Sequence, residues 1–302
     1  MKRVVGAAVA AGAGVLAWSL IEAQSFTVRQ ISAPVLAPGS KPIRILHLSD
    51  LHLTPSQRRK VAWIRHLASF RPDLVVDTGD NLAHVDAVPT ALEALEPLME
   101  FPGVFVHGSN DYYAPTPRNP FKYLKEPTQA REGKTSLDTE ALTAGFEAGG
   151  WVGLNNVRAS LEIAGTEIAF VGLDDPHIGR DRLPAQDGGA TDAALRIGVV
   201  HAPYLRALGQ LREDGAQVIL AGHTHGGQVN VPGKGALVTN CDLDTARASG
   251  LHGWPGPRPD EQGGSESAWL HVSAGLGTSP YTPVRLACRP EATMLTLLPR
   301  RA

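Results

Sequence analysis

Histidines and aspartates recur in short, glycine-rich segments that lie far apart in the chain. Asp50 and His52 are two residues apart in SDLHL, and His223 and His225 show the same spacing in AGHTHGGQ. Carboxylate oxygens and imidazole nitrogens together suit Mn, Fe, Zn or Co. The segments therefore predict a site for divalent metals, with these candidate ligands: Asp50, His52, Asp80, His201, His223 and His225.

The candidate ligands follow apolar runs that are typical of buried strands. IRILHLSD (43–50), DLVVDTGD (73–80) and GVFVHGSND (103–111) are three such runs, and helical patterns cover Pro55–Phe70 and Asp86–Glu100 between them. Alternation of strand and helix predicts an α/β core. Because strand ends meet at one edge of a sheet, the ligands are expected to converge despite their separation in sequence.

Composition narrows the class of protein. The chain has 302 residues, 43% hydrophobic and 19% charged, which is enough for a sizeable core in one large domain or two small ones. A net charge of −2 gives no electrostatic case for a nucleic-acid partner, so a nuclease is disfavoured. Cys241 and Cys288 are too few for a disulfide framework or a thiolate metal cluster, and one disulfide or two separate thiols both remain open.

The N-terminus, residues 1–24, is a hydrophobic segment ahead of the main domain at 25–302. Lys2 and Arg3 precede eighteen uncharged residues, Val4–Ile21, of which six are Ala and three are Gly. A spanning helix needs about 20 apolar residues, so a signal anchor, a cleaved export signal ending near Ala23 and a buried helix are the alternatives. Either of the first two predicts a membrane-associated or exported protein with its main domain outside the cytoplasm.

Three further segments are predicted to be turns or loops. Residues Ala114–Thr135 and Ala248–Ser267 are rich in Pro or Gly, as long functional loops often are. GLDDPHIG (172–179) offers two aspartates and a histidine, for which turn chemistry is favoured over a third metal site. Four side chains near the third strand either contact substrate or lie in solvent: Tyr112, Tyr113, Arg118 and Lys122.

Taken together, the motifs resemble those of the calcineurin-like metallophosphoesterases, in a bacterial branch similar to YkuE and YaeI. The resemblance begins at LIE (20–22) and continues through ILHLSDLHLTP, VDTGDN and AGHTHGGQV to SAGLGTSPYTPVRLACRPEATMLTL near the C-terminus. It implies a four-layer α/β fold in which two mixed β-sheets pack as a sandwich flanked by helices. An N-terminal hydrophobic helix would precede this fold.

The resemblance also implies a centre of two divalent metal ions, with Mn favoured over Fe, Zn or Co. Asp50, His52 and His225 would bind the first metal, and Asp80 would bridge both. The second metal would be bound by an asparagine together with His201 and His223. A metal-bridging hydroxide would then attack a phosphomonoester or phosphodiester, and a lipid-linked or envelope-derived substrate would suit the N-terminal segment.

HGSND (107–111) departs from the family, in which Gly-Asn-His is followed by Asp or Glu. A match without gaps makes Ser109 the metal ligand, whereas a one-residue bulge makes Asn110 the ligand and puts Asp111 in place of the histidine; Asn110 is favoured. A general acid is worth about 10²–10⁴-fold, so weaker cleavage of poor leaving groups is expected. Asp111 replaces the acid only if its pKa is raised. The alternative is a catalytically weakened protein that binds metal or phosphate.

Overall fold

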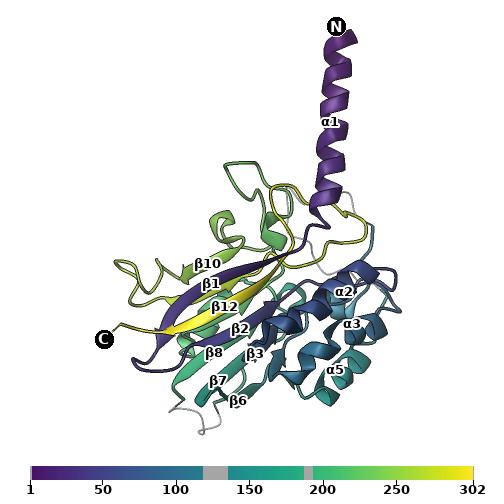
Figure 1. Cartoon of the computed structure of the whole chain (residues 1–302). Coiled ribbons are helices and arrows are strands. Elements are labelled where there is room, and N and C mark those ends of the chain that lie inside the picture. Colours follow the sequence, from purple (N-terminus) through teal and green to yellow (C-terminus); the bar gives the residue numbers. More distant parts are fainter. Residues whose placement is uncertain (1, 118–134, 187–192, 302) are drawn as a thin grey trace.

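The computed structural model describes residues 2–117, 135–186 and 193–301. It begins with a 21-residue helix, α1 (Lys2–Glu22), most of which stands away from the remaining chain (Figure 1). Among the helices described, none is both long and apolar enough to cross a membrane. The last turn of α1 packs into the domain, because Ser19, Glu22 and Ala23 are buried.

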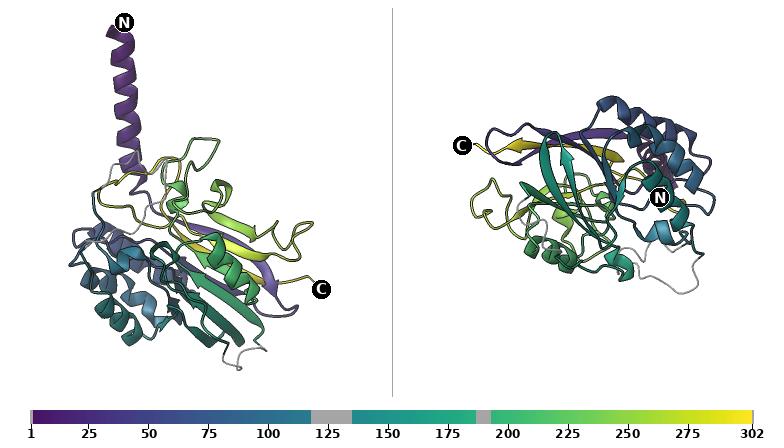
Figure 2. Two further views of the ribbon diagram at one scale, coloured as in Figure 1. Left: turned by 180° about the vertical axis from the view of Figure 1, so that it is seen from behind. Right: turned by 90° about the horizontal axis from the view of Figure 1, so that it is seen from below.

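In the described part of the chain, the strands form two six-stranded sheets that pack face to face (Figure 2). The first has the order β1 (Thr27–Leu36), β12 (Glu291–Pro299), β2 (Ile43–Leu48), β3 (Leu74–Asp77), β4 (Gly103–Phe105) and β5 (Val152–Gly153). The second has the order β10 (Gly250–Trp254), β11 (Ala268–Val272), β9 (Val218–Ala221), β8 (Leu195–Val200), β7 (Thr166–Leu173) and β6 (Arg158–Ile163).

Both sheets are mixed. In the first, β2, β3, β4 and β5 run parallel, whereas β12 pairs antiparallel with β2 and parallel with β1. In the second, β7, β8, β9 and β11 run parallel, and the edge strands β6 and β10 pair antiparallel. Side chains from both sheets meet in one buried cluster that includes Ile45, Val76, Ile197 and Leu220. The carboxyl ends of the parallel strands are thereby held against one another.

Helices cover the outer faces. α2 (Arg58–His66), α3 (Val88–Leu95) and α5 (Thr139–Ala148) pack on the first sheet, and α6 (Leu205–Glu213) packs on the second. The described chain also contains short helices of about one turn: α4 (Ser109–Tyr112), η1 (Leu67–Phe70), η2 (Glu96–Glu100), η4 (Pro176–Ile178), η5 (His225–Gly227) and η6 (Thr245–Arg247). The predicted four-layer α/β sandwich, preceded by a helix, is confirmed.

The predicted bounds of individual helices and loops are only partly correct. The predicted helix at Pro55–Phe70 begins only at Arg58, because the residues before it form a turn in which Gln57 N donates to Thr54 O. The predicted loop at Ala248–Ser267 is wrong in part, since it contains β10. Gly253 is needed within that strand because a Cβ there would lie 1.9 Å from the Pro257 carbonyl oxygen, so a glycine that indicated a loop serves close packing.

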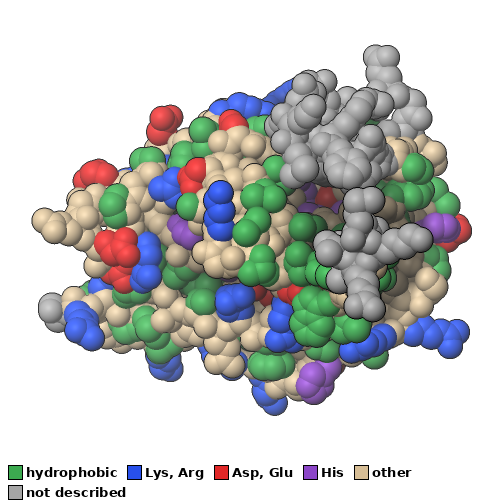
Figure 3. Space-filling model, turned by 90° about the horizontal axis from the view of Figure 1, so that it is seen from above, with side chains coloured by type: hydrophobic (Ala, Val, Ile, Leu, Met, Phe, Trp, Pro, Cys, Tyr) green, Lys and Arg blue, Asp and Glu red, His purple; other side chains and the backbone are tan. Residues whose placement is uncertain are grey.

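The two cysteines are separate thiols: Cys288 is buried and Cys241 is half-buried. On the face seen from above in Figure 3, acidic and basic side chains are interspersed over the surface. Most of the loop predicted at Ala114–Thr135, with Arg118 and Lys122, lies outside the described residues.

Candidate metal centre

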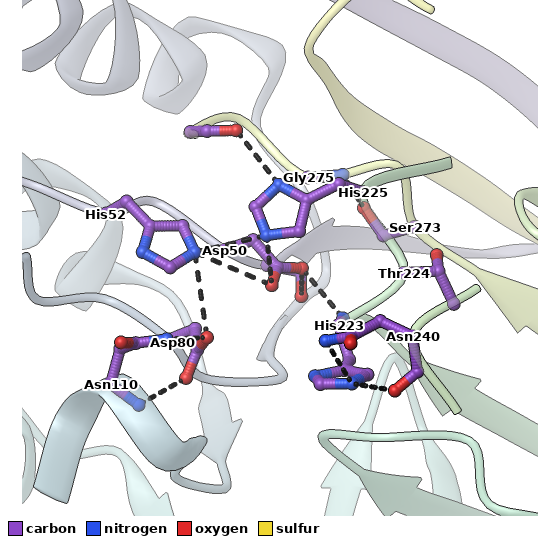
Figure 4. A network of polar contacts seen from close by, with 12 residues as sticks. Asp50, His52, Asp80, Asn110, His223, Thr224, His225, Asn240, Ser273 and Gly275 are labelled. Carbon is purple, nitrogen blue, oxygen red and sulfur yellow. Dashed lines mark hydrogen bonds and ion pairs between the residues drawn. The ribbon is translucent and has the colours of Figure 1, made fainter. Parts of the chain in front are cut away.

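The six histidines and aspartates predicted as ligands lie where strands of the two sheets end. Figure 4 shows Asp50, His52, Asp80, His223 and His225 near one another, and His201 Nε2 lies 3.5 Å from Asp80 Oδ1. Asp50 and His52 follow β2, and Asp80 follows β3. The loops after β8 and β9 of the second sheet supply the remaining three, His201, His223 and His225. Sandwich packing brings these loops to one place, so residues up to 175 positions apart in sequence share a site.

Three side chains form a first ligand group: Asp50, His52 and His225. The Nε2 atoms of His52 and His225 are 3.2 Å apart. Asp50 Oδ1 lies 3.4 Å from the Nε2 atom of His225 and 4.0 Å from that of His52. Three ligand atoms of mixed O and N type thus face a common point.

A second group consists of Asp50, Asp80 and His201. Asp80 Oδ1 lies 3.5 Å from His201 Nε2, whereas Asp80 Oδ2 lies 3.6 Å from His52 Nε2. One carboxylate therefore offers one oxygen toward each group, which is the geometry that a bridging ligand requires.

The residues fit a metal centre because buried ligand atoms lack any other partner. Asp50 Oδ1 and His201 Nε2 are buried without a hydrogen bond, which is costly unless a ligand satisfies them. The other ring nitrogens are engaged: His201 Nδ1 lies 2.7 Å from Thr78 O and His225 Nδ1 lies 3.1 Å from Gly277 O. Such bonds place the proton on Nδ1 and leave the Nε2 lone pair for a metal.

Burial sets the protonation of the imidazoles. It lowers the pKa of His52 and His223 well below the usual value, and burial with the nearby Arg285 lowers that of His225 to about 3. These three rings are therefore neutral. Burial also lowers the pKa of His201, but the Asp80, Asp175 and Asp50 carboxylates outweigh it and raise the value to about 9. His201 must lose its proton before its Nε2 can bind a cation.

Five of the candidate ligands have left-handed backbone, which non-glycine residues rarely adopt. Backbone hydrogen bonds between the ligand loops hold two of them: Asp50 N donates to Gly79 O at 2.8 Å, and His52 N to Asp80 O at 3.0 Å. Strain of this kind costs about 1–3 kcal/mol per residue and gathers at functional sites. The residues and φ values are Asp50 (52°), His52 (42°), Asp80 (58°), His223 (69°) and His225 (51°).

Asn110, in α4, contacts the bridging candidate Asp80 through both its backbone and its side chain. Asn110 N donates to Asp80 Oδ1 at 2.7 Å, and Asn110 Nδ2 to Asp80 Oδ2 at 2.6 Å (Figure 4). The loop packs closely here, because a Cβ on Gly108 would lie 2.3 Å from Asp80 Oδ1. Ser109 is buried. Asn110 thus reaches the metal-ligand cluster through its NH2 group, whereas a metal would bind its carbonyl oxygen, so the choice between Ser109 and Asn110 stays a prediction.

Asp111 has a different place from the one expected of a general acid. Its Oδ2 accepts the backbone N–H groups of Asp80 at 2.8 Å and Gly108 at 3.0 Å, and its Oδ1 accepts that of Asn81 at 2.7 Å. The side chain is fully buried. A proton on either oxygen would compete with these bonds. These bonds join the variant loop (107–111) to the turn that holds Asp80; the role of Asp111 as general acid stays a prediction.

Two side chains contact the ligands although they were not predicted to do so. The ring of His177 lies 4.6 Å from that of His223, and its Nδ1 lies 3.1 Å from the hydroxyl of Tyr204. Arg285 Nη2 lies 3.4 Å from His225 Nδ1. His177 was attributed to turn chemistry, which does explain its backbone, since Asp175 Oδ1 accepts the His177 N–H at 2.9 Å.

Comparison with known proteins agrees with this geometry. The model of the calcineurin-like phosphoesterase family matches residues 43–227, from β2 to the GHTHGG segment. YpbG of Bacillus subtilis (strain 168) is 30% identical over 271 residues, which cover 86% of this chain and 82% of that protein. The chain therefore belongs to the calcineurin-like phosphoesterases, as the resemblance indicated.

Two further relatives carry more descriptive names. Phosphodiesterase YaeI of Escherichia coli (strain K12) is 26% identical, over 86% of this chain and 84% of that one. A transmembrane protein with metallophosphoesterase domain from Bos taurus is 29% identical, over 91% of this chain and 58% of that one. The similarity to both extends over most of the chain described above.

Proposed function

We propose that the protein is a dinuclear metal-dependent phosphoesterase that hydrolyses phosphodiesters or phosphomonoesters. The observation that carries this proposal is the convergence of Asp50, Asp80 and His201, in which Asp50 Oδ1 and His201 Nε2 are buried without a hydrogen-bond partner. Membership of the phosphoesterase family supports it. The name of the YaeI relative favours a phosphodiester.

The proposed first ion would be held by Asp50, His52 and His225, and the second by His201, His223 and Asn110, with Asp80 between them. When bound, two divalent cations supply hydroxide at neutral pH and neutralise phosphoryl oxygens. Two aspartates and one hydroxide offset only three of the four positive charges. The remaining charge of about +1 would attract the phosphate ester.

Two residues of the variant loop (107–111) bear on the leaving group. The side chain of Asn110 donates a hydrogen bond to Asp80, and the carboxylate of Asp111 accepts hydrogen bonds from backbone N–H groups. Without a positioned histidine in this loop, cleavage would depend strongly on the acidity of the leaving alcohol. We therefore expect faster turnover of nitrophenyl esters than of alkyl esters by more than the difference in their intrinsic reactivity.

The test uses the full chain loaded with Mn²⁺, assayed on bis-p-nitrophenyl phosphate and p-nitrophenyl phosphate. We expect turnover that Asp80→Asn reduces by roughly 10³-fold, because the bridging carboxylate is lost and several kcal/mol of charge stabilisation go with it. Two bound metals without any Asp80-dependent turnover would instead support the second candidate, a non-catalytic binder of metal or phosphate.

We also propose that α1 attaches the enzyme to a membrane, with the main domain outside the cytoplasm. The free part of α1 exposes apolar side chains, including Val9, Val15 and Leu16, each more than half exposed. The name of the Bos taurus relative supports this placement. Flotation with phospholipid vesicles tests it: the full chain should float, and Val15→Ser/Leu16→Ser should sediment. Equal sedimentation of both proteins would rule the attachment out.

A further inference from the structure

We infer that Glu22, in the last turn of α1, is a positioning residue for the metal centre and acts through the loop 285–288. This rests on the proposed function, since it concerns the first ligand group of the same site. Glu22 was not predicted to have any role in the site, and it lies 203 positions before His225.

The carboxylate of Glu22 is buried against the backbone of the loop 285–288. Its Oε1 accepts the N–H of Cys288 at 2.8 Å, and its Oε2 accepts that of Ala287 at 3.1 Å. Ala287 has left-handed backbone, with φ 51°. Alternation of left- and right-handed backbone turns successive N–H groups toward one anion. The loop is therefore shaped around the carboxylate of Glu22.

A second contact fixes the same loop to α1. Arg285 N donates to Ser19 O at 3.0 Å, one turn before Glu22, and Ser19 is 6% exposed. Trp18 Nε1 donates to Glu22 Oε2 at 3.0 Å and holds the carboxylate in place. The loop is thus attached at both ends of its length to the last two turns of α1.

Arg285 transmits this attachment to the ligands. Its guanidinium is fully buried and donates to Ala274 O and to Gly277 O, each at 2.7 Å. Gly277 O also lies 3.1 Å from His225 Nδ1, so Arg285 and His225 share one acceptor. A buried guanidinium is stable only while its acceptors stay in place. Displacement of Arg285 would therefore disturb the bond that orients His225.

The segment 274–277 contacts the other ligand loop as well. Gly277 N donates to Asp50 O, and Leu276 N to Ser49 O, at 2.6 Å and 3.1 Å. A Cβ on Gly275 would lie 2.6 Å from Asp50 Cβ, so the two loops are in close contact. Glu22 thus bears on His225, which belongs to the first group alone, and on Asp50, which both groups share. The other second-group ligands, Asp80 and His201, are held by other contacts, to Asn110 and Thr78.

The test measures metal affinity in the full chain. Cobalt(II) is titrated into metal-free protein, with visible absorption reporting ligand geometry and equilibrium dialysis reporting the number of ions bound. Loss of a residue that orients a ligand typically costs about 10–100-fold in metal affinity. We expect Glu22→Ala to weaken the binding of one of the two ions by this factor and to change its absorption band. The other ion, which does not contact His225, should lose much less affinity.

Two further variants make the test specific. Glu22→Gln keeps an oxygen for one of the two N–H groups, so we expect it to fold and to show an intermediate loss of metal affinity. It replaces Glu22→Ala in the test if that variant does not fold. Ser25→Ala removes an exposed hydrogen bond to Ile21 O at the same helix end, without touching the loop 285–288, and should match the wild type.

The outcomes separate this inference from the proposed function. Glu22-dependent binding of one ion in a protein without turnover supports the positioning role and overturns the enzymatic proposal. Wild-type affinity for both ions in folded Glu22→Ala or Glu22→Gln overturns the positioning role, and so does an equal loss at both sites. A wild-type chain that binds no metal overturns both.

Discussion

His52 and His225 present their Nε2 atoms to each other at 3.2 Å, although they lie 173 positions apart in the chain. Burial keeps both rings neutral, and the bond from His225 Nδ1 to Gly277 O leaves its Nε2 lone pair facing inward. A proton on His52 Nε2 is donated to His225 Nε2 at this distance; once it is lost, the two lone pairs repel unless a positive charge lies against both. With Asp50 Oδ1 also facing them, a divalent cation satisfies all three atoms.

The first prediction concerns this pair. His225→Ala should reduce the number of Mn²⁺ ions bound per chain from two to one, and should lower turnover by roughly 10³-fold because one Lewis acid is lost. Metal content by mass spectrometry after dialysis measures the first effect. His84→Ala is the control, since that histidine is half exposed and pairs with Asp86. Two ions retained in His225→Ala would contradict the assignment.

The second prediction concerns Asp111. Asp111→Ala removes the acceptor of three backbone N–H groups and should lower the free energy of unfolding by at least about 3 kcal/mol. Urea denaturation of the metal-free protein measures this. Asp138→Ala, which removes the exposed cap of α5, should cost only about 1 kcal/mol. If Asp111→Ala changes only the pH–rate profile and leaves the free energy of unfolding unaltered, Asp111 acts as a general acid.

Much of the site follows from the sequence because its ligands are marked by residue type and by the ends of strands. Asp50, His52 and Asp80 lie two to four positions after the end of β2 or β3, and parallel strands carry them to one edge. The left-handed backbone of these residues is different, because it depends on bonds between loops, such as Asp50 N to Gly79 O. No spacing in the sequence reveals it.

The fold, too, combines features that the sequence predicts with contacts between distant segments that it does not predict. The sandwich follows from alternating strands and helices, but the contact of Glu22 with Cys288 joins positions 266 apart. Both residues are unremarkable in their own segments, and only the packing of the last turns of α1 against the loop 285–288 brings them together. Asp111 shows the same combination: its position after Asn110 indicated chemistry, whereas the backbone N–H groups that donate to its carboxylate belong to Asp80 and Asn81, 31 and 30 positions earlier.

A third prediction decides between Ser109 and Asn110. Asn110→Ala should lower the affinity for the second metal ion by roughly 10-fold or more, because the amide that contacts Asp80 is removed. Ser109→Ala is the matched variant one position earlier and should change the affinity less than twofold. Competitive titration with a chelating dye measures both. A larger loss in Ser109→Ala than in Asn110→Ala would favour the match without gaps, in which serine is the ligand.

The last prediction uses Lys60, a buried lysine of α2 whose Nζ donates to Leu51 O at 2.8 Å, between the ligands Asp50 and His52 in sequence. Burial, with the nearby Arg285, lowers the pKa of Lys60 to about 7. In the unfolded chain the pKa of lysine is about 10.4. Between these values the unfolded chain holds more protons, so stability rises with pH from about 7 to about 10.

Lys60→Met keeps most of the volume and removes the charge. The free energy of unfolding of the wild type, relative to this variant, should therefore increase by up to about 1.4 kcal/mol per pH unit between pH 7 and pH 9. Urea denaturation at pH 7, 8 and 9 measures the difference, and Lys41→Met, at an exposed lysine, should show no such slope. A wild-type advantage that is constant over this range would mean that Lys60 stays protonated in the folded protein.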